Sequence, residues 1–244
     1  MGIHEMIQFF RQNFGKLTPH LFAGMQPPSN LEQMAFLKNL QKEIRKNNYL
    51  ETPLCKLKVV VFDLETTGFQ PEKGDQIISI GAIKMTGSRM EETETFYSLI
   101  NIRQPLQENI IRLTNITDQE LRNAPEPAEV LFQFLRFIKS DILVAHHSFH
   151  EKAFMDKLSQ DLLGKRFDHR IIDTSFLIKT SAPAMKAIQL EEICKICGIE
   201  IKNRHHALGD ALMTAKIWSR YLQEASAKGY KNLHDIYAFI SKLK

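Results

Sequence analysis

The stretch VVVFDLETTGF, residues 59–69, places two carboxylates at the end of a β-branched, apolar run. Such a run predicts a strand that is buried on both faces. Side chains alternate between the faces of a strand, so Asp63 and Glu65 should point the same way. Both ionise readily only if a cation lies between them, and oxygen ligands favour Mg²⁺ or Mn²⁺. The stretch therefore predicts a divalent metal site, the alternative being a strand end with two solvated acids.

The residues that follow this strand predict a turn. Gly68 permits a sharp change of direction after Thr66 and Thr67. Backbone N–H groups exposed at such a turn can meet a phosphate. We therefore expect these three residues to contact an anionic substrate.

The sequence beyond residue 56 predicts a mixed sheet. Three strand-like stretches joined by short turns indicate an antiparallel meander. Two further strand-like stretches alternate with helical ones, which is typical of strands joined by crossover helices. The strands are expected at 57–64, 76–85, 93–100, 141–146 and 169–174, and the clearest helices at 127–140 and 149–163. This order predicts an α/β fold with helices on both faces of the sheet.

The two ends of the chain differ from this pattern. Residues 1–56 hold two helical patterns separated by a loop at 24–30, and the second has an apolar stripe with basic residues around it. We expect a helical extension that packs on a main domain at 57–224, the alternative being a docking arm for a protein or nucleic acid. Residues 225–244 predict one more amphipathic helix packed on that domain.

The composition limits the class of protein. Of 244 residues, 43% are hydrophobic and 25% charged, which is ordinary for a soluble chain. No apolar run approaches the length needed to span a bilayer, and the N-terminus lacks a secretory signal pattern, so no membrane partner is expected. Three cysteines indicate a reduced, cytoplasmic setting. A net charge of +4 permits an anionic partner such as nucleic acid without requiring one.

A second group of candidate residues lies in RHHALGDALMTAKIW, residues 204–218. Alanines that recur every fourth residue predict a helix that approaches the sheet closely, and Asp210 lies beside them near the helix start. Five steps of a helix turn through about 140° from Asp210's direction, so His205 is expected on the preceding loop. An acid that binds a metal and a mobile histidine that takes a proton are the parts of metal-assisted hydrolysis. A polar loop is the alternative for the histidines.

Five motifs together resemble one family. FDLETTG, IISIGAI, LTNIT, IIDT and HHALGDALMTA occur in the order expected of DEDDh 3′–5′ exonucleases, a family that includes the proofreading subunit of bacterial replicative polymerases and RNase T. The resemblance covers about residues 57–222 and implies an RNase H-like fold with two divalent metal ions, Mg²⁺ or Mn²⁺. It implies that Asp63 bridges both ions and that Glu65 and Asp210 complete the first site. His205 would be the general base, and His206 stands where tyrosine-type members carry Tyr.

The second motif of the family departs from its usual form. His-Asn-x-x-Phe-Asp-x-x-Phe is expected, and the chain has HHSFHEKAF at 146–154, with His147 in place of Asn, His150 in place of Phe and Glu151 in place of Asp. The family's acid commonly faces the second metal through water, which absorbs a longer side chain, so we expect Glu151 to replace it. Two alternatives stay open: His150 contributes instead, or the second metal binds weakly and activity is low. His146 and His147 are expected to touch substrate or water, or else to be polar residues at a strand end.

The resemblance implies hydrolysis of phosphodiester bonds from the 3′ end of single-stranded or frayed DNA or RNA, with release of nucleoside monophosphates. The alternative is a catalytically weak or inactive module that binds nucleic acid or protein. An enzyme that selects ends grips bases on apolar side chains. Phe69 and Phe154 are the candidates, with core packing as the alternative for each. A protein partner is expected through the N-terminal helices.

Overall fold

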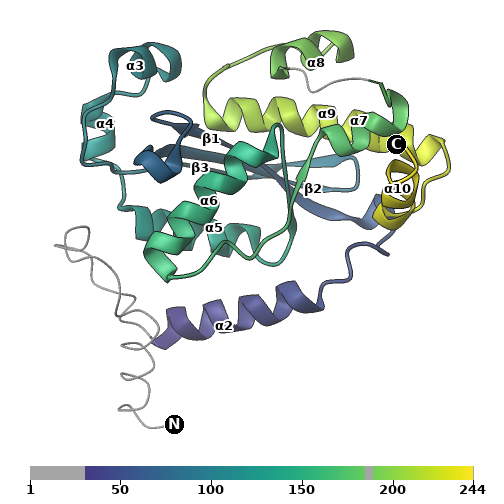
Figure 1. Ribbon diagram of the computed structural model, residues 1–244, viewed down its shortest axis with the longest axis horizontal. Coiled ribbons are helices and arrows are strands. Elements are labelled where there is room, and N and C mark those ends of the chain that lie inside the picture. Colours follow the sequence, from purple (N-terminus) through teal and green to yellow (C-terminus); the bar gives the residue numbers. More distant parts are fainter. Residues whose placement is uncertain (1–30, 185–188, 244) are drawn as a thin grey trace.

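The apolar run that ends at Asp63 forms β1, the central strand of a five-stranded sheet in a computed structural model that describes residues 31–184 and 189–243. The strand order is β3-β2-β1-β4-β5 (Figure 1). The strands are β1 (Lys58–Thr66), β2 (Ile77–Thr86), β3 (Arg89–Leu99), β4 (Ile142–Ala145) and β5 (Ile171–Asp173). Strands β1, β2 and β3 pair antiparallel, whereas β4 and β5 continue parallel to β1. The predicted meander followed by parallel strands is confirmed.

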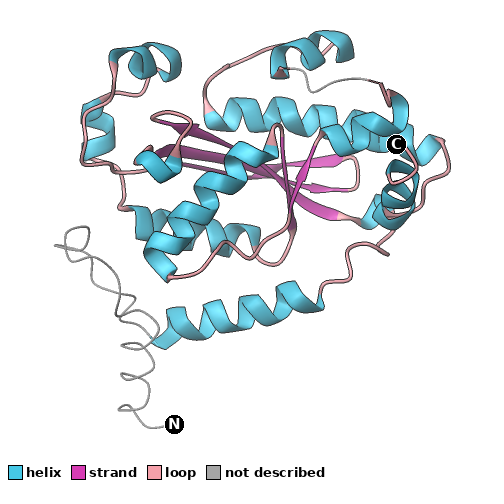
Figure 2. Cartoon of the chain, viewed as in Figure 1, coloured by secondary structure: helices cyan, strands magenta, loops and turns pink. Residues whose placement is uncertain are grey.

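Helices cover both faces of this sheet, as the sequence predicts (Figure 2). One face is packed by α7 (Ser175–Ser181), α8 (Leu190–Cys197), α9 (Ala207–Ala227) and α10 (Leu233–Ile240). The other is packed by α2 (Leu31–Lys46), α5 (Pro127–Ile138) and α6 (Ser148–Leu163). The short helices α3 (Glu108–Thr114) and α4 (Asp118–Arg122) lie in the connection between β3 and α5. The single-turn segments η1 (Leu54–Lys56) and η2 (Pro71–Lys73) flank β1.

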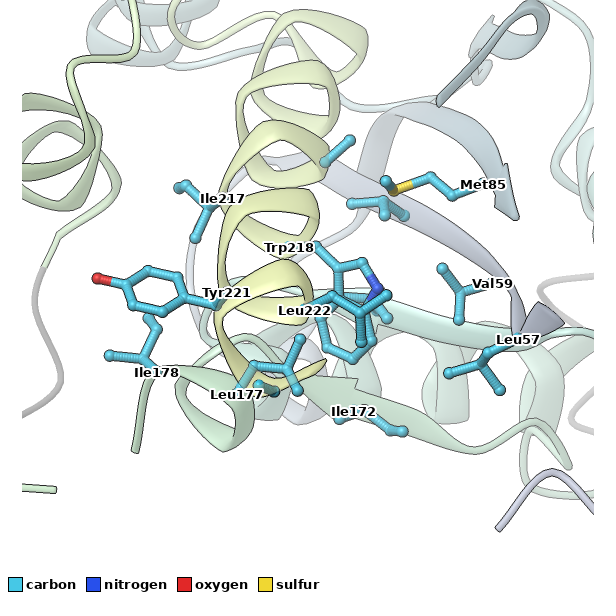
Figure 3. Close-up of a cluster of buried hydrophobic side chains, with 14 of the residues drawn as sticks. Leu57, Val59, Met85, Ile172, Leu177, Ile178, Ile217, Trp218, Tyr221 and Leu222 are labelled. Carbon is cyan, nitrogen blue, oxygen red and sulfur yellow. The ribbon is translucent and has the colours of Figure 1, made fainter. Parts of the chain in front are cut away.

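The alternation of β1 side chains produces two separate cores. Val59 and Val61 pack toward α9, and Val60 and Phe62 pack toward α5 and α6. Figure 3 shows the first core, where the fully buried Trp218 of α9 lies over the sheet beside Leu222. Each fully buried Val, Leu or Ile side chain in these cores stabilises the fold by about 1.5–3 kcal/mol. Because Asp63 and Glu65 continue the period of Val59 and Val61, their carboxylates lie on the α9 face.

The start of α9 lies directly on β2. A Cβ atom added to Gly81 would lie only 2.1 Å from the backbone nitrogen of Leu208, so glycine is required for this approach. Ala207, Ala211 and Ala215 are buried completely against the sheet, as the alanine spacing predicts. The close contact brings the first turn of α9 beside the end of β1.

The described part of the N-terminal extension is α2. Leu40 of this helix is buried in the second core, and Gln41 Nε2 donates to Asp168 Oδ2 at 2.9 Å. The basic residues of α2 are exposed on its outer side; they are Lys38, Lys42, Arg45 and Lys46. The first of the two expected N-terminal helices lies outside the described residues.

The C-terminal segment packs through α10, whose Leu233 and Ile236 are buried in the first core. Helix α9 runs to Ala227, so the expected division between residues 224 and 225 falls inside a helix. The spacing of apolar residues in the sequence does not reveal where α9 ends and α10 begins.

Candidate metal and catalytic site

Four acids from three elements lie near the C-terminal end of β1. Asp63 and Glu65 come from β1, Glu151 from the first turn of α6 and Asp210 from the first turn of α9. Glu65, Asp210 and His205 each offer one ligand atom, and these atoms all lie within 4.8 Å of one another. The negative charges of Glu151, Asp210 and Glu65 all act on Asp63. The structure therefore groups Glu65, His205 and Asp210 within ligand distance, and places Asp63 and Glu151 near enough for their charges to interact.

Burial and mutual repulsion leave these acids poorly disposed to ionise. Burial, followed by the charge of Glu151, raises the pKa of Asp63 well above its ordinary value. Burial and then Asp210 raise the pKa of Glu65 to about 8. Burial also raises the pKa of Glu151 to about 8 and that of Asp210 to about 6. A divalent cation would reverse these shifts, because it stabilises the ionised form of every carboxylate around it.

The cluster has the chemistry to accept such a cation. Glu151 Oε2 and Asp210 Oδ1 are buried and have no hydrogen-bond partner among the described residues. Buried acceptors without a partner cost free energy, so a ligand is expected to satisfy them. Carboxylate oxygens suit Mg²⁺ or Mn²⁺.

His205 lies on the loop before α9, as the angular argument predicts. Helix α9 begins at Ala207, with His206 as its N-cap residue. Asn203 and His205 both have positive φ, 50° and 61°, which turns the His205 ring toward the acids. Burial, followed by the neighbouring Arg204 charge, lowers the pKa of His205. A neutral imidazole beside the acids is suited to accept a proton.

His206 has a structural environment different from that of His205. Its Nδ1 accepts from the backbone N–H of Gly209, and its ring stacks on Tyr97 with centroids 4.3 Å apart. Tyr97 comes from β3, far from the loop in sequence, and sequence analysis did not identify it. The stack helps to fix the start of α9.

The altered second motif forms the start of α6. His147 is the exposed N-cap residue in a left-handed conformation, and His146 Nδ1 lies 2.7 Å from Thr174 Oγ1. His150 lies against Phe69 and Phe154, with ring centroids 5.7 Å and 4.7 Å away.

Asp173, in the IIDT motif, holds this helix start in place. Its carboxylate accepts from the backbone N–H groups of Ser148, at 2.7 Å, and Ser175, at 2.9 Å. Its charge also contributes to the raised pKa of Glu151. The motif indicated that Asp173 belongs to the family pattern but not what the carboxylate does.

The turn after β1 is held by contacts within itself. The N–H of Thr67 donates to Gln76 O at 2.9 Å, and its hydroxyl accepts from the Gln76 N–H, also at 2.9 Å. The expectation that Thr67 offers an exposed N–H to phosphate is wrong, because that N–H is already bonded. Thr66 donates its hydroxyl to Gly68 O at 2.7 Å. A Cβ atom on Gly68 would lie 2.4 Å from Asp75 Oδ2, so a larger residue here would displace that carboxylate.

The two candidate stacking residues have opposite environments. Phe69 is 86% exposed beside His150, whereas Phe154 is 1% exposed inside the second core. The prediction that Phe154 stacks a base is wrong, because a buried ring has no free face. Phe149, which is 88% exposed at the start of α6, was missed because an apolar residue in a helical pattern indicates core.

The acid cluster makes metal-free stability depend on pH. The pKa values of Glu65 and Glu151, about 8 against an ordinary 4.5, mean that the folded state binds more protons than the unfolded state between these values. Their contribution is complete below about pH 4.5 and is lost as the pH rises through about 8. We expect the thermal midpoint of metal-stripped protein to fall across this window. A midpoint that rises instead would contradict the assignment, and Glu65→Gln with Glu151→Gln should flatten the dependence.

Comparisons with known proteins agree with this geometry. A family model described as an exonuclease (RNase_T) matches residues 60–218. The chain is 36% identical to a DNA polymerase III subunit epsilon-like protein of Rhodobacter capsulatus over 73% of its own length and 26% of the relative. It is 35% identical to the DNA polymerase III subunit epsilon of Aquifex aeolicus, over 68% of this chain and 80% of that one. It therefore spans about a quarter of the Rhodobacter relative, and 12% of several PolC-type relatives.

The fold is also found among solved structures. The nuclease domain of 3′hExo, described as a DEDDh family member bound to rAMP, superimposes with a TM-score of 0.60 at 19% identity, covering 73% of this chain and 94% of that one. Exonuclease X, solved with a 5′ overhanging duplex DNA, gives 0.55 at 18% identity over 73% and 98%. The family match covers more than half of the chain and includes the four acids and His205. The chain belongs to the exonuclease family.

Proposed function

We propose that this chain is a metal-dependent 3′–5′ exonuclease that hydrolyses phosphodiester bonds from the 3′ end of single-stranded or frayed DNA or RNA and releases nucleoside monophosphates. The observation that carries the proposal is the convergence of four buried or half-buried carboxylates, two with an unpartnered oxygen, beside a histidine whose pKa is lowered. A binding module would gain nothing from so costly a cluster. The exonuclease relatives support the same reaction class.

Each residue of the cluster has a proposed part. Asp63, Glu65 and Asp210 would hold one divalent ion, and Asp63 with Glu151 a second. The ions supply Lewis acidity and charge stabilisation for the phosphoryl group. His205 takes a proton from the attacking water, since its neutral ring has an accepting nitrogen.

The substrate end is proposed to enter beside Phe69. Its exposed ring offers a face on which a terminal base can stack, a contact worth about 1–3 kcal/mol per base and tolerant of sequence. His147, exposed at the start of α6, lies where a backbone phosphate can reach it. Thr66 and Gly68 shape the turn that carries Phe69.

A direct assay tests the reaction. Single-stranded DNA and RNA, each labelled at the 3′ terminal nucleotide, are incubated with the protein in Mg²⁺ or Mn²⁺, and a 5′-labelled copy serves as the polarity control. We expect mononucleotides from the 3′ label at the earliest times. Absence of release from both nucleic acids in both metals would leave the binding module as the better reading. Comparing DNA with RNA identifies the preferred substrate.

The Glu151 assignment predicts an ordered series of activities. Glu151 is buried and its charge acts on Asp63, whereas His150 faces Phe69 and Phe154, which supports Glu151 as the fourth acid. We expect Glu151→Asp to keep or raise the rate of nucleotide release. Glu151→Ala should lower it about 10- to 100-fold, as loss of a group that orients a metal site does. Wild-type activity in Glu151→Ala would show that another residue fills this position, and His150→Ala is the matched variant.

The cellular setting is also a proposal. No helix in the part of the chain that the structure describes is both long and apolar enough to cross a bilayer. The cysteines Cys55, Cys194 and Cys197 are all free thiols, which supports a reduced cytoplasm. The exposed basic side of α2 is the proposed surface for a protein partner.

A further inference from the structure

Arg204 inserts a positive charge among the acids of the site. Its Nη1 donates to Asp210 Oδ2 and lies 3.2 Å from His205 Nδ1, while its Nε donates to Glu191 Oε1 at 2.6 Å. Glu191 lies in the first turn of α8, so one guanidinium joins α8, the His205 loop and α9. We call the Glu191–Arg204–Asp210 contacts the Arg204 bridge.

The bridge occupies two functional atoms at once. Asp210 Oδ2 is paired with a guanidinium N–H, and Asp210 is the acid proposed to hold the first metal. The contact at His205 Nδ1 can only be donated by the arginine, because a guanidinium has no acceptor. A nitrogen that already accepts an N–H cannot also accept a proton from water.

A divalent ion therefore competes with Arg204 for Asp210. Positive charges a few ångströms apart repel strongly at a partly buried site. The two carboxylate partners of Arg204 differ in exposure: the side chain of Asp210 is 3% exposed and that of Glu191 is 30% exposed. Glu191, the more exposed of the two carboxylates, would remain as a partner when Asp210 is taken.

We propose that Arg204 exchanges with the metal: in the metal-free chain it binds Asp210 and His205, and on metal entry it keeps Glu191 alone and frees both. The proposal rests on the proposed function for the assignment of Asp210 as a metal ligand. Arg204 acts as a positioning residue in this exchange, coupling metal entry to release of the base. Glu191 holds the displaced cation.

The proposed exchange predicts opposite changes in metal affinity when Arg204 and Glu191 are each replaced. Arg204→Met removes the competitor and should tighten metal binding. Glu191→Gln removes the second carboxylate, so the guanidinium stays on Asp210 and metal binding should weaken. Each shift is expected within about 5- to 150-fold, the usual range for coupling between two binding events. A role that is merely structural would weaken metal binding in both variants.

Calorimetric titration of metal-stripped protein with Mg²⁺ and Mn²⁺, without nucleic acid, measures these affinities. Arg220→Met and Glu224→Gln are the matched controls, because that pair, 3.1 Å apart, lies further along α9 away from the acids. Arg204→Gln replaces Arg204→Met if the latter fails to fold. A second readout is the ¹⁵N shift of His205 Nδ1, which should change on metal addition in the wild-type chain and already differ in Arg204→Met.

Shifts of the same sign in both variants, affinities equal to the controls, or no metal binding by the wild-type chain would overturn the exchange. Tighter metal binding in Arg204→Met together with weaker binding in Glu191→Gln supports it, and the reverse pair of shifts contradicts it. The titration uses no substrate, so it tests the exchange separately from the proposed function. If the two variants show the expected changes in metal affinity but the wild-type chain releases no nucleotide, only the proposed function is contradicted.

Discussion

Asp63→Asn is expected to abolish nucleotide release while making the metal-free protein more stable to heat. Asp63 is proposed to help hold both metal ions, so its loss would remove a ligand from each, and the rate should fall at least about 10³-fold. Burial and the neighbouring acids raise the pKa of Asp63, which shows that its ionised form is disfavoured without metal. An amide of the same shape carries no charge and removes that repulsion. Activity and stability therefore move in opposite directions.

Asp141→Asn is the matched control. Asp141 immediately precedes β4, and burial raises its pKa as well, but β4 is parallel to β1, so this residue lies at the opposite end of the sheet. The control should leave nucleotide release unchanged. Release by Asp63→Asn at a rate near the wild type, or a lower thermal midpoint than the wild type without metal, would contradict the assignment.

His205→Ala is expected to lower kcat about 10²- to 10⁴-fold, the usual contribution of a general base. Metal affinity should change little by comparison, because carboxylates supply most of the ligands. In the wild-type chain the acid limb of the rate profile should lie below the ordinary histidine value, since burial lowers the pKa of His205. As the pH rises through that lowered pKa the ring becomes neutral and activity increases. The limb should be absent in His205→Ala.

His206→Asn separates the two adjacent histidines. Asparagine is a favourable N-cap residue, so this variant keeps the cap of α9 while removing the imidazole. Most of the activity should remain. A loss in His206→Asn as large as that in His205→Ala would move the general base to position 206, where tyrosine-type members carry their Tyr.

The sequence predicts the catalytic geometry where local periodicity determines it. Alternation along a strand places Asp63 and Glu65 on one face. The angular spacing of residues in a helix places His205 on the loop before α9. Both conclusions need only the backbone, which is why they agree with the structure. The strand-like stretches with short turns between them likewise predict the meander, and the later strands that alternate with helices predict the rest of the mixed sheet.

Residues whose roles depend on contacts between distant elements were not predictable. Phe149 and Phe154 are five positions apart in α6, yet one is exposed and the other is in the core, because neighbouring elements decide which side of the helix is covered. Tyr97 meets His206 only through the pairing of β2 with β3 and the docking of α9. Arg204 is adjacent to a predicted base, but its contact with Glu191 requires α8 to fold beside the loop.

The contact of α9 with Gly81 has a consequence for how the protein tolerates change. Asp210 is placed beside the β1 carboxylates by main-chain atoms resting on main-chain atoms, with no side chain between them. Main-chain atoms are the same whichever residues occupy the rest of the interior. Conservative substitutions of core side chains away from this contact should therefore leave the separation of the reactive groups unchanged.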